Sequence, residues 1–552
     1  MGIKNGFFKE CIKLKNNTIL KNGPIKPFWR IIFFLLIISL VIGSILIINF
    51  SITSNGLNLL SQNLKDFFSP ASYSELYEKN LFLLSISFLW NSIKLVFLST
   101  FIGFILAMIT AYFSNLKMNS KYVAIPFKII IIFLRIFPEL FFIYLFKISF
   151  DKALAINLIY CWFTWLWLHE YFSQTIENAN FSIFFHITKT KQSKWKAFWI
   201  DIWPQIKIKF ISHYIYAFEG NLRWSTILAN FGYFGIGILL NPQEYPIDYT
   251  QLLIPLFVLV TFLVLLEIAS QHINKFLFES KTINGANKKK YTTIKSIKIT
   301  LLTFFILIGI IIAGFSLQSL IGQKFYKTGA ISFFQKIFNP NWKNLIWNFS
   351  HDGIFWILLQ FFSLIFLTFF FVYIISYFKM LLMAKSLLGK KVAWIFKHFN
   401  IFMRAIPVVV LFLLITNLFN QFSAAFVLAF SIHSSSSISR NLYQTINAVN
   451  EEKISELKKM KYGNFWIYRN YIRPQIKLDF ITFSTFEIER ITRNFITYGS
   501  LSSSILGQKT NITKFNDIED IAPYLWIGFL IISFINLVSY VTRLKWTNQK
   551  WI

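Results

Sequence analysis

The chain has 552 residues, of which 55% are hydrophobic and only 14% are charged, with a mean hydropathy of +0.54. Soluble domains carry roughly 25% charged residues, so this composition excludes a soluble globular protein. Lys and Arg outnumber Asp and Glu by 55 to 24. These cations lie between apolar runs and not in one patch, so we expect no nucleic-acid partner.

Apolar runs along the chain predict an all-α integral membrane protein with about twelve transmembrane helices. A basic segment, 1–30, precedes the first run, which is long enough to span and lacks a signal-peptide cleavage site. We expect six spans in a first half, 31–270, near 31–50, 93–113, 127–146, 153–168, 208–238 and 252–270.

A basic segment, 271–298, separates this half from a second one, 299–541, and a short tail, 542–552, follows. The second half is predicted to span near 299–319, 353–378, 399–418, 422–437, 478–506 and 523–541. If the chain starts inside and alternates, most Lys and Arg fall on the inward segments. We therefore expect a multi-pass protein of the cell membrane with both termini and the linker in the cytoplasm, and outward loops at 51–90 and 320–352.

The two halves show a weak internal repeat at an offset of 269 to 270 residues. Phe133–Leu140 parallels Phe402–Val409, and the Pro-Gln pair Pro204 and Gln205 parallels Pro474 and Gln475. Farther along, Glu219, Arg223 and Gly237 fall on Glu489, Arg493 and Gly507. Four matches in order indicate duplication of a half with an even number of spans.

Two arginines within apolar runs, Arg135 and Arg404, each lie three residues before a proline, Pro138 and Pro407. An arginine at bilayer depth costs at least about 2.5–3.5 kcal/mol, so each is expected to face a partner or a wet cavity. Proline kinks a helix and frees a carbonyl toward the same interior. This pattern indicates either a charged translocation pathway or a structural ion pair, with snorkelling to the membrane face as a further alternative.

The couple Glu219 and Arg223 is spaced four residues apart and can pair on one helix face, and Glu489 with Arg493 repeats the spacing. Such couples are either purely structural or opened by substrate during transport. Asn221 lies between the first two and adds polarity to the same predicted span.

Long basic segments, 170–206 and 440–476, occur at the same place in both halves and end at the Pro-Gln pairs. Each is either an amphipathic helix on the membrane surface or a docking loop for a soluble partner. Their recurrence in both halves favours docking.

Catalytic and nucleotide-binding motifs are absent from the sequence. It contains no G-x-x-x-x-G-K-[ST], H-E-x-x-H or G-x-S-x-G, and no Cys and His cluster for a metal. These absences weaken every membrane-enzyme hypothesis, and we expect a chain that is not an enzyme and carries no cofactor or metal.

In these residues the chain resembles permease subunits of bacterial ABC importers of the phosphonate class. Their motifs are an Arg-x-x-Pro, a loop ending in Leu-Pro-Gln, a Glu-x-Asn-x-Arg and a glycine-rich stretch, which here includes Gly232, Gly235 and Gly237. The fusion of two halves and the Phe, Ile, Lys and Asn bias are similar to the large permease of a mycoplasmal high-affinity transport system.

The sequence departs from that family in the loops. The family's loop glycine is replaced by Lys191 and Lys461, and Ser193 and Gly463, two residues later, are expected to form the turn instead. In the second half Arg473 replaces the leucine before Pro474, and Ile491 replaces the asparagine.

The resemblance implies a type I ABC importer permease fold and a function in import. Two copies of a cytoplasmic ATPase would dock on the two loops, an extracellular lipoprotein would deliver solute, and the permease would hydrolyse no ATP. The implied solute is a phosphonate or another small organophosphate; a phosphorylated cofactor such as a thiamine phosphate is equally compatible. From the residues alone, a secondary transporter driven by an ion gradient remains the main alternative.

Overall fold

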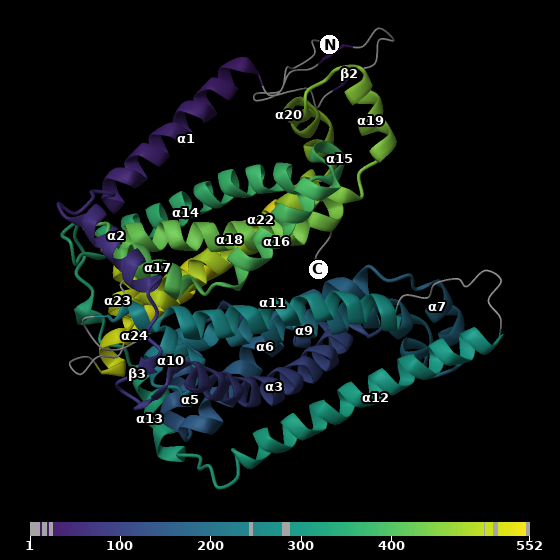
Figure 1. Cartoon of the computed structure of the whole chain (residues 1–552), viewed down its shortest axis with the longest axis horizontal. Helices are drawn as coiled ribbons and strands as arrows, with labels where there is room; N and C mark the ends of the chain where they lie inside the picture. The colour runs from purple at the N-terminus through teal and green to yellow at the C-terminus, as the bar shows by residue number, and fades with distance from the viewer. Residues whose placement is uncertain are drawn as a thin grey trace.

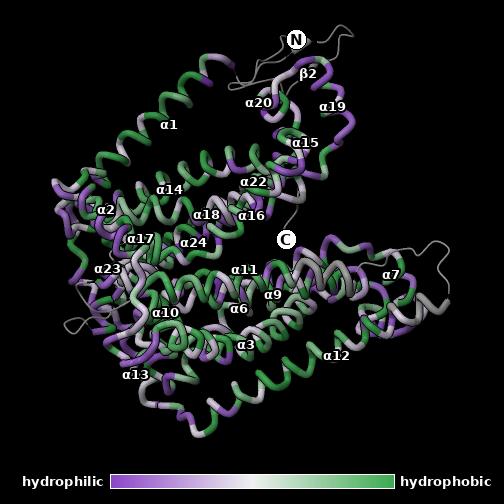
Figure 2. The backbone as a smooth tube through the Cα atoms, in the orientation of Figure 1, coloured by the Kyte–Doolittle hydropathy of each residue, from purple (hydrophilic) through white to green (hydrophobic). Residues whose placement is uncertain are grey.

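The structure is a computed structural model, and it describes residues 12–13, 19–20, 26–241, 247–278, 288–501, 503–511 and 517–547. Most of these residues are helical (Figure 1). Figure 2 shows long hydrophobic helices in the middle of the molecule and hydrophilic segments at its two ends, as expected for a bundle that crosses a bilayer.

The first half comprises α1 to α11. Its helices are α1 (Pro27–Ile48), α2 (Gly56–Phe67), α3 (Leu81–Phe113), α4 (Lys121–Ile136), α5 (Glu139–Ser149), α6 (Lys152–Glu177), α7 (Ser182–Lys189), α8 (Lys194–Ala197), the π-helix η1 (Phe198–Ile202), α9 (Trp203–Leu228), the 3-10 turn η2 (Ala229–Phe231), α10 (Ile236–Leu240), the 3-10 turn η3 (Tyr249–Gln251) and α11 (Leu253–Phe278). Two short antiparallel ribbons pair β1 (Ile12–Lys13) with β2 (Ile19–Leu20) and β3 (Tyr73–Ser74) with β4 (Lys79–Asn80).

The second half comprises α12 to α24. Its helices are α12 (Lys288–Gln318), α13 (Lys327–Phe338), the 3-10 turn η4 (Trp342–Asn344), α14 (Ile354–Met383), α15 (Lys385–Leu388), α16 (Lys390–Ala405), α17 (Val408–Thr416), α18 (Phe422–Asn447), α19 (Glu451–Lys459), α20 (Asn464–Ile467), the π-helix η5 (Tyr468–Ile472), α21 (Arg473–Gln475), α22 (Lys477–Thr497), the 3-10 turn η6 (Tyr498–Leu501), α23 (Ile505–Lys509) and α24 (Ile518–Thr547).

The elements of the two halves recur in the same order and at nearly constant spacing. The starts of α4 and α16 are 269 residues apart, and those of α6 and α18 are 270 apart, with equal lengths in each pair. The π-helices η1 and η5 also lie 270 residues apart. This recurrence at the level of helices supports the duplication that the sequence indicates.

The prediction of a helical multi-pass membrane protein is confirmed, whereas the predicted number of twelve spans is not. Within the described residues, seven helices are long and apolar enough to cross a membrane, or up to nine if each of two bent pairs is one span. Every predicted span overlaps helical residues, but the spans predicted at 127–146, 208–238, 399–418 and 478–506 each cover a break between helices. Helices α6, α9 and α22 do not meet the criterion for a membrane span.

Several predicted boundaries are wrong because helices extend beyond the apolar runs that mark the spans or lie between them. The segments predicted as outward loops, 51–90 and 320–352, contain α2 and α13, and α3 begins at Leu81. The ends of the 271–298 linker are helical, as parts of α11 and α12, whereas 279–287 lies outside the described residues, as do Cys11 and 548–552.

The first helix of each half packs against the other half. Helix α1 contacts α14 of the second half, and α12 contacts α3 of the first half (Figure 1). At one end of the bundle, short antiparallel bridges tie the segments that follow these helices to the opposite half, between Ile52 and Phe419 and between Phe150 and Phe325. Each half therefore packs its first helix on the other half. The two bridges, which we call the clamps, join the halves at this end of the bundle.

The second clamp includes a carboxylate. Asp151 accepts hydrogen bonds from Tyr326 Oη (2.6 Å) and from the Lys324 amide (2.8 Å). These two hydrogen bonds lower the pKa of Asp151, so its carboxylate stays ionised and keeps both contacts at neutral pH.

The predicted proline kinks are sharp breaks. Helices α4 and α5 meet at 87°, and α16 and α17 meet at 81°. Pro138 and Pro407 stand immediately before α5 and α17, and the residue before each proline is extended, as the proline ring requires. Each break leaves the last carbonyls of the preceding helix without partners inside that helix.

The glycine-rich stretch after α9 allows a close backbone crossing. A Cβ at Gly237 would lie 2.0 Å from the Ser225 carbonyl oxygen, and a Cβ at Gly499 would lie 2.0 Å from the backbone of Gly507. Only glycine fits such an approach, so these positions hold α10 and α23 against α9 and η6.

Gly237→Ala is expected to destabilise the protein by about 1–3 kcal/mol, because backbone must move to admit the methyl group. The measurement is the melting temperature of the purified chain in detergent. Gly314→Ala in α12, where a Cβ would meet nothing within 4 Å, is the matched control and should not lower it. Equal melting temperatures for the two variants would contradict the close crossing.

Candidate functional site

A cavity of about 260 Å³ lies between the halves, beside the two helix breaks. The first half contributes the α4–α5 break, α6 and α9, and the second contributes the start of α17, α18 and α22. Among the described residues, four arginines and four glutamates line it together with many aromatic rings. The charged lining residues are Arg135, Glu139, Glu170, Arg223, Glu487, Glu489, Arg490 and Arg493.

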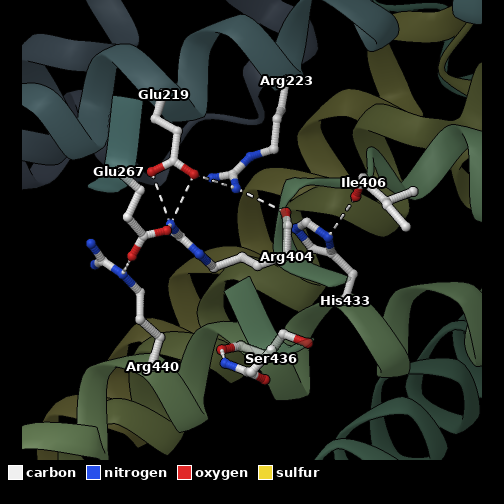
Figure 3. A network of polar contacts seen from close by, with 9 residues as sticks. Glu219, Arg223, Glu267, Arg404, Ile406, His433, Ser436 and Arg440 are labelled. Atoms are coloured by element: carbon white, nitrogen blue, oxygen red, sulfur yellow. Dashed lines mark hydrogen bonds and ion pairs between the residues drawn. The ribbon is translucent and has the colours of Figure 1, made fainter. Parts of the chain in front are cut away.

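Beside this cavity lies a buried ion-pair network, which we call the Arg404 network (Figure 3). The Arg404 side chain is 0% exposed, and its Nη2 lies 2.9 Å from a Glu219 oxygen and 2.5 Å from Glu267 Oε2. The second oxygen of Glu267 accepts from Arg440 Nε at 3.1 Å. Since Glu219 and Glu267 belong to the first half and both arginines to the second, every one of these contacts joins the halves.

Arg223 completes this network. It pairs with Glu219 at 3.1 Å, which confirms the predicted couple along one helix face. Its Nη1 also donates to the Arg404 carbonyl at 2.9 Å. That carbonyl is available because α16 ends at Ala405, one residue later.

The corresponding network on the other side of the cavity, the Arg135 network, is less buried. Arg135 lies 2.5 Å from Glu170 and 3.8 Å from Glu489, and its side chain is 20% exposed. Glu489 also pairs with Arg543 at 3.1 Å. The contacts of Arg135 with Glu489 and of Arg404 with Glu219 are thus equivalent in the repeat, and both cross between halves.

The predicted couple of Glu489 with Arg493 is wrong as an ion pair, because Glu489 pairs with Arg135 and Arg543 instead. Arg493 lines the cavity, and its Nη2 is buried without a hydrogen-bond partner among the described residues. The nearby Glu139 accepts from the Thr497 hydroxyl at 3.1 Å. Arg493 therefore presents an unused donor beside the cavity.

Six of the nine predicted pathway residues line the cavity: Arg135, Asn221, Arg223, Pro407, Glu489 and Arg493. The other three, Pro138, Glu219 and Arg404, lie behind it. For Arg404 the structural ion pair is the better interpretation. The Asn221 amide is also held structurally, since it donates to the hydroxyls of Thr100 and Thr164.

Seven charged residues of the site were not predicted: Glu139, Glu170, Glu267, Arg440, Glu487, Arg490 and Arg543. Glu170 and Arg440 were assigned to cytoplasmic loops, but α6 and α18 continue past them. Glu267, Glu487 and Arg490 lie within predicted spans, where a charge is itself a signal that sequence reasoning could have used.

The predicted docking loops form helical hairpins at the end of the bundle opposite the clamps (Figure 1). Lys191 and Lys461 adopt left-handed φ angles of 61° and 63°, whereas Ser193 and Gly463 have φ of −64° and −68°. The expectation that Ser193 and Gly463 form the turn is therefore wrong. The turn lies at the two lysines, where the resembled family has glycine, and the left-handed conformation strains a residue with a Cβ.

The Pro-Gln pairs follow the π-helices. Pro204 and Pro474 are near the first residue of the next helix, where a missing N–H is tolerated. The Gln205 side chain bonds both backbone groups of Asn180 and the Asp201 carboxylate, which closes the first hairpin. Gln475 is exposed.

Comparisons with known proteins agree with this architecture. Residues 381–543 match the family described as binding-protein-dependent transport system inner membrane component. The chain is 29% identical over 532 residues to the ABC transport system permease protein p69 of Mycoplasma genitalium, covering 94% of this chain and 95% of that protein. It is 26% identical to p69 of Mycoplasma pneumoniae, covering 84% and 87%. No solved structure matches. Together these similarities support an ABC transporter permease subunit.

Arg404→Gln is expected to destabilise the chain by about 3–5 kcal/mol, because it leaves Glu219 and Glu267 buried without their shared cation. Arg135→Gln, the equivalent change in the first half, should cost less, because its side chain is partly exposed and cavity water can reach Glu170. Melting temperatures and yields of monodisperse protein in detergent measure both. A larger loss for Arg135→Gln would contradict the difference in burial.

Proposed function

We propose that this chain is the fused permease subunit of an ATP-binding-cassette importer that forms the alternating-access pathway for a small anionic solute, such as a phosphonate or another organophosphate. It would cross the cell membrane about twelve times, with both termini in the cytoplasm. Two copies of a cytoplasmic ATPase and an extracellular substrate-binding lipoprotein would be its partners, and the ATPase would carry out all hydrolysis.

The observation that carries the proposal is the pair of equivalent ion pairs across the seam between the halves, Arg135 with Glu489 and Arg404 with Glu219. They lie at the broken helices on either side of one shared cavity. A pathway between two repeats, bordered by discontinuous helices, is the arrangement by which transporters expose a site alternately to each face.

The unpartnered donor of Arg493 is the group best suited to an anionic solute. Every other arginine that lines the cavity pairs with a glutamate within the protein, namely Arg135, Arg223 and Arg490. A guanidinium binds phosphate or phosphonate oxygens through charge-assisted hydrogen bonds. An incoming anion would therefore satisfy Arg493 without breaking a pair.

A phosphorylated cofactor such as a thiamine phosphate is the second candidate solute. The cavity lining includes aromatic side chains, such as Trp167, Tyr171 and Phe486, beside carboxylates, such as Glu487. Aromatic faces and carboxylates bind a cationic ring, while Arg493 would take its phosphate.

The two hairpins after α6 and α18 are the proposed docking sites for the ATPases. They expose large apolar side chains, including Trp195 (48%) and Ile200 (51%) in the first half and Met460 (68%) and Phe465 (50%) in the second. Trp195 and Phe465 are equivalent in the repeat, so two identical ATPase copies would each find an exposed aromatic side chain at the same place.

Reconstitution tests the function directly. The purified chain is placed in liposomes with or without its ATPase and binding protein, and uptake of radiolabelled phosphonate or thiamine phosphate is measured with ATP or with an ion gradient. We expect accumulation only with all three proteins and ATP. Uptake by the chain alone, driven by the gradient, would instead show a secondary transporter.

The docking hairpin provides a matched variant pair for the same assay. Proline cannot adopt the positive φ of Lys191, so Lys191→Pro should reduce ATPase co-purification at least tenfold, whereas Lys191→Gly fits the turn and should preserve it. Normal co-purification of the proline variant would reject the docking assignment.

Arg493→Gln is expected to lower uptake at least tenfold with little change in melting temperature, because the guanidinium Nη2 has no hydrogen-bond partner to lose within the described part of the chain. Lys65→Gln, which removes an exposed cation from α2, serves as the control for net charge and should transport normally. Undiminished uptake by Arg493→Gln would exclude Arg493 as the solute group.

A further inference from the structure

One position in the repeat carries opposite charges in the two halves. Glu170 is the nineteenth residue of α6 and Arg440 the nineteenth of α18, and both helices have 26 residues. Both side chains contact the ion-pair networks between the halves. The helix geometry is repeated here, so the difference lies in the charge alone.

In the first half, Glu170 supplies the close carboxylate for Arg135, at 2.5 Å. Glu489 of the second half then lies between Arg135 and Arg543. The Arg135 network therefore holds two arginines and two glutamates and is neutral.

In the second half, Arg440 stands at the position that corresponds to Glu170. Without a further acid, Arg404 would lie beside another positive charge. Glu267 of α11, from the first half, lies between them and pairs with both, at 2.5 Å and 3.1 Å. The residue 270 positions later is Leu537, so the second half has no equivalent acid there. Arg404, Arg440, Glu219 and Glu267 again contain two charges of each sign, and Arg223, which lines the cavity, adds a third arginine on Glu219.

We propose that Glu170, Arg440 and Glu267 make the surface of the first half complementary to that of the second half. The same residues prevent either half from pairing with a second copy of itself. Two first-half surfaces facing one another would bring three carboxylates, Glu170, Glu219 and Glu267, around two arginines, Arg135 and Arg223. Two second-half surfaces would bring Arg404, Arg440 and Arg543 around a single glutamate. An unbalanced buried charge is strongly unfavourable. Pairing of a first half with a second half is therefore selected, because pairing of two identical halves is excluded.

This inference does not rest on the proposed transport function, and its test is the stability of the full-length chain. Arg440→Glu makes position 440 resemble the first half and places a carboxylate against Glu267. Glu267→Gln leaves Arg440 unpaired beside Arg404. Each single change is expected to lower the melting temperature in detergent by at least about 5 °C.

The double variant Arg440→Glu/Glu267→Gln should recover most of that loss. The carboxylate introduced at position 440 would then reach Arg404 as Glu170 reaches Arg135. Together with Arg223 and Glu219, this gives two arginines and two carboxylates, which is the charge balance of the Arg135 network. A double variant at least as unstable as the sum of the single changes would overturn the proposal, because it would show that the two positions are not coupled.

The exchange variant Glu170→Arg/Arg440→Glu is the matched control, since it keeps the net charge and the same two positions. It places a guanidinium at position 170 against Arg135 and a carboxylate at position 440 against Glu267, so both networks become unbalanced, and we expect loss of monodisperse protein. Stability equal to that of the unmodified chain would also overturn the proposal, because it would show that only the total charge matters there.

Discussion

The structure depends on one constraint, which is that an arginine fully enclosed at the seam between the two halves must be neutralised where it lies. Arg404 is fully enclosed, and it is tolerated only because Glu219 and Glu267 reach it from the opposite half. The charges that neutralise Arg404 are therefore supplied by the other half of the chain. The same charges determine which surfaces of the two halves face one another.

The other elements of the fold hold the two halves together on either side of this seam. Helices α1 and α12 cross to the opposite half, and the clamps at Phe150 and Ile52 join the halves at one end of the bundle. The proposed docking hairpins lie at the other end, where the turn at Lys191 recurs at Lys461. A bundle that is tied at one end and has a charged seam between its halves is suited to rocking of one half against the other, driven from the free end.

Much of the fold could be predicted from the sequence, because apolar run length and repeated short motifs are local signals. Each predicted span overlaps helical residues, and the breaks at Pro138 and Pro407 follow from the chemistry of proline. The extent of α6 could not be predicted, since its last turns are amphipathic. That misplacement moved Glu170 into a loop and concealed its contact with Arg135. The partner of Glu489 was also beyond sequence reasoning, because an i,i+4 spacing shows which pair is possible and not which cation from another helix lies closer.

The central claim, that the two halves move against each other about this charged seam, is tested most directly by the distance between the docking hairpins. Spin labels at Thr190 and Met460, which are equivalent and exposed, would be placed in a chain lacking Cys11 and Cys161. Pulsed electron paramagnetic resonance would then measure the separation with the ATPase present, before and after addition of ATP. The account predicts that the labels approach when ATP binds and separate after hydrolysis. An unchanged distance during uptake would contradict it.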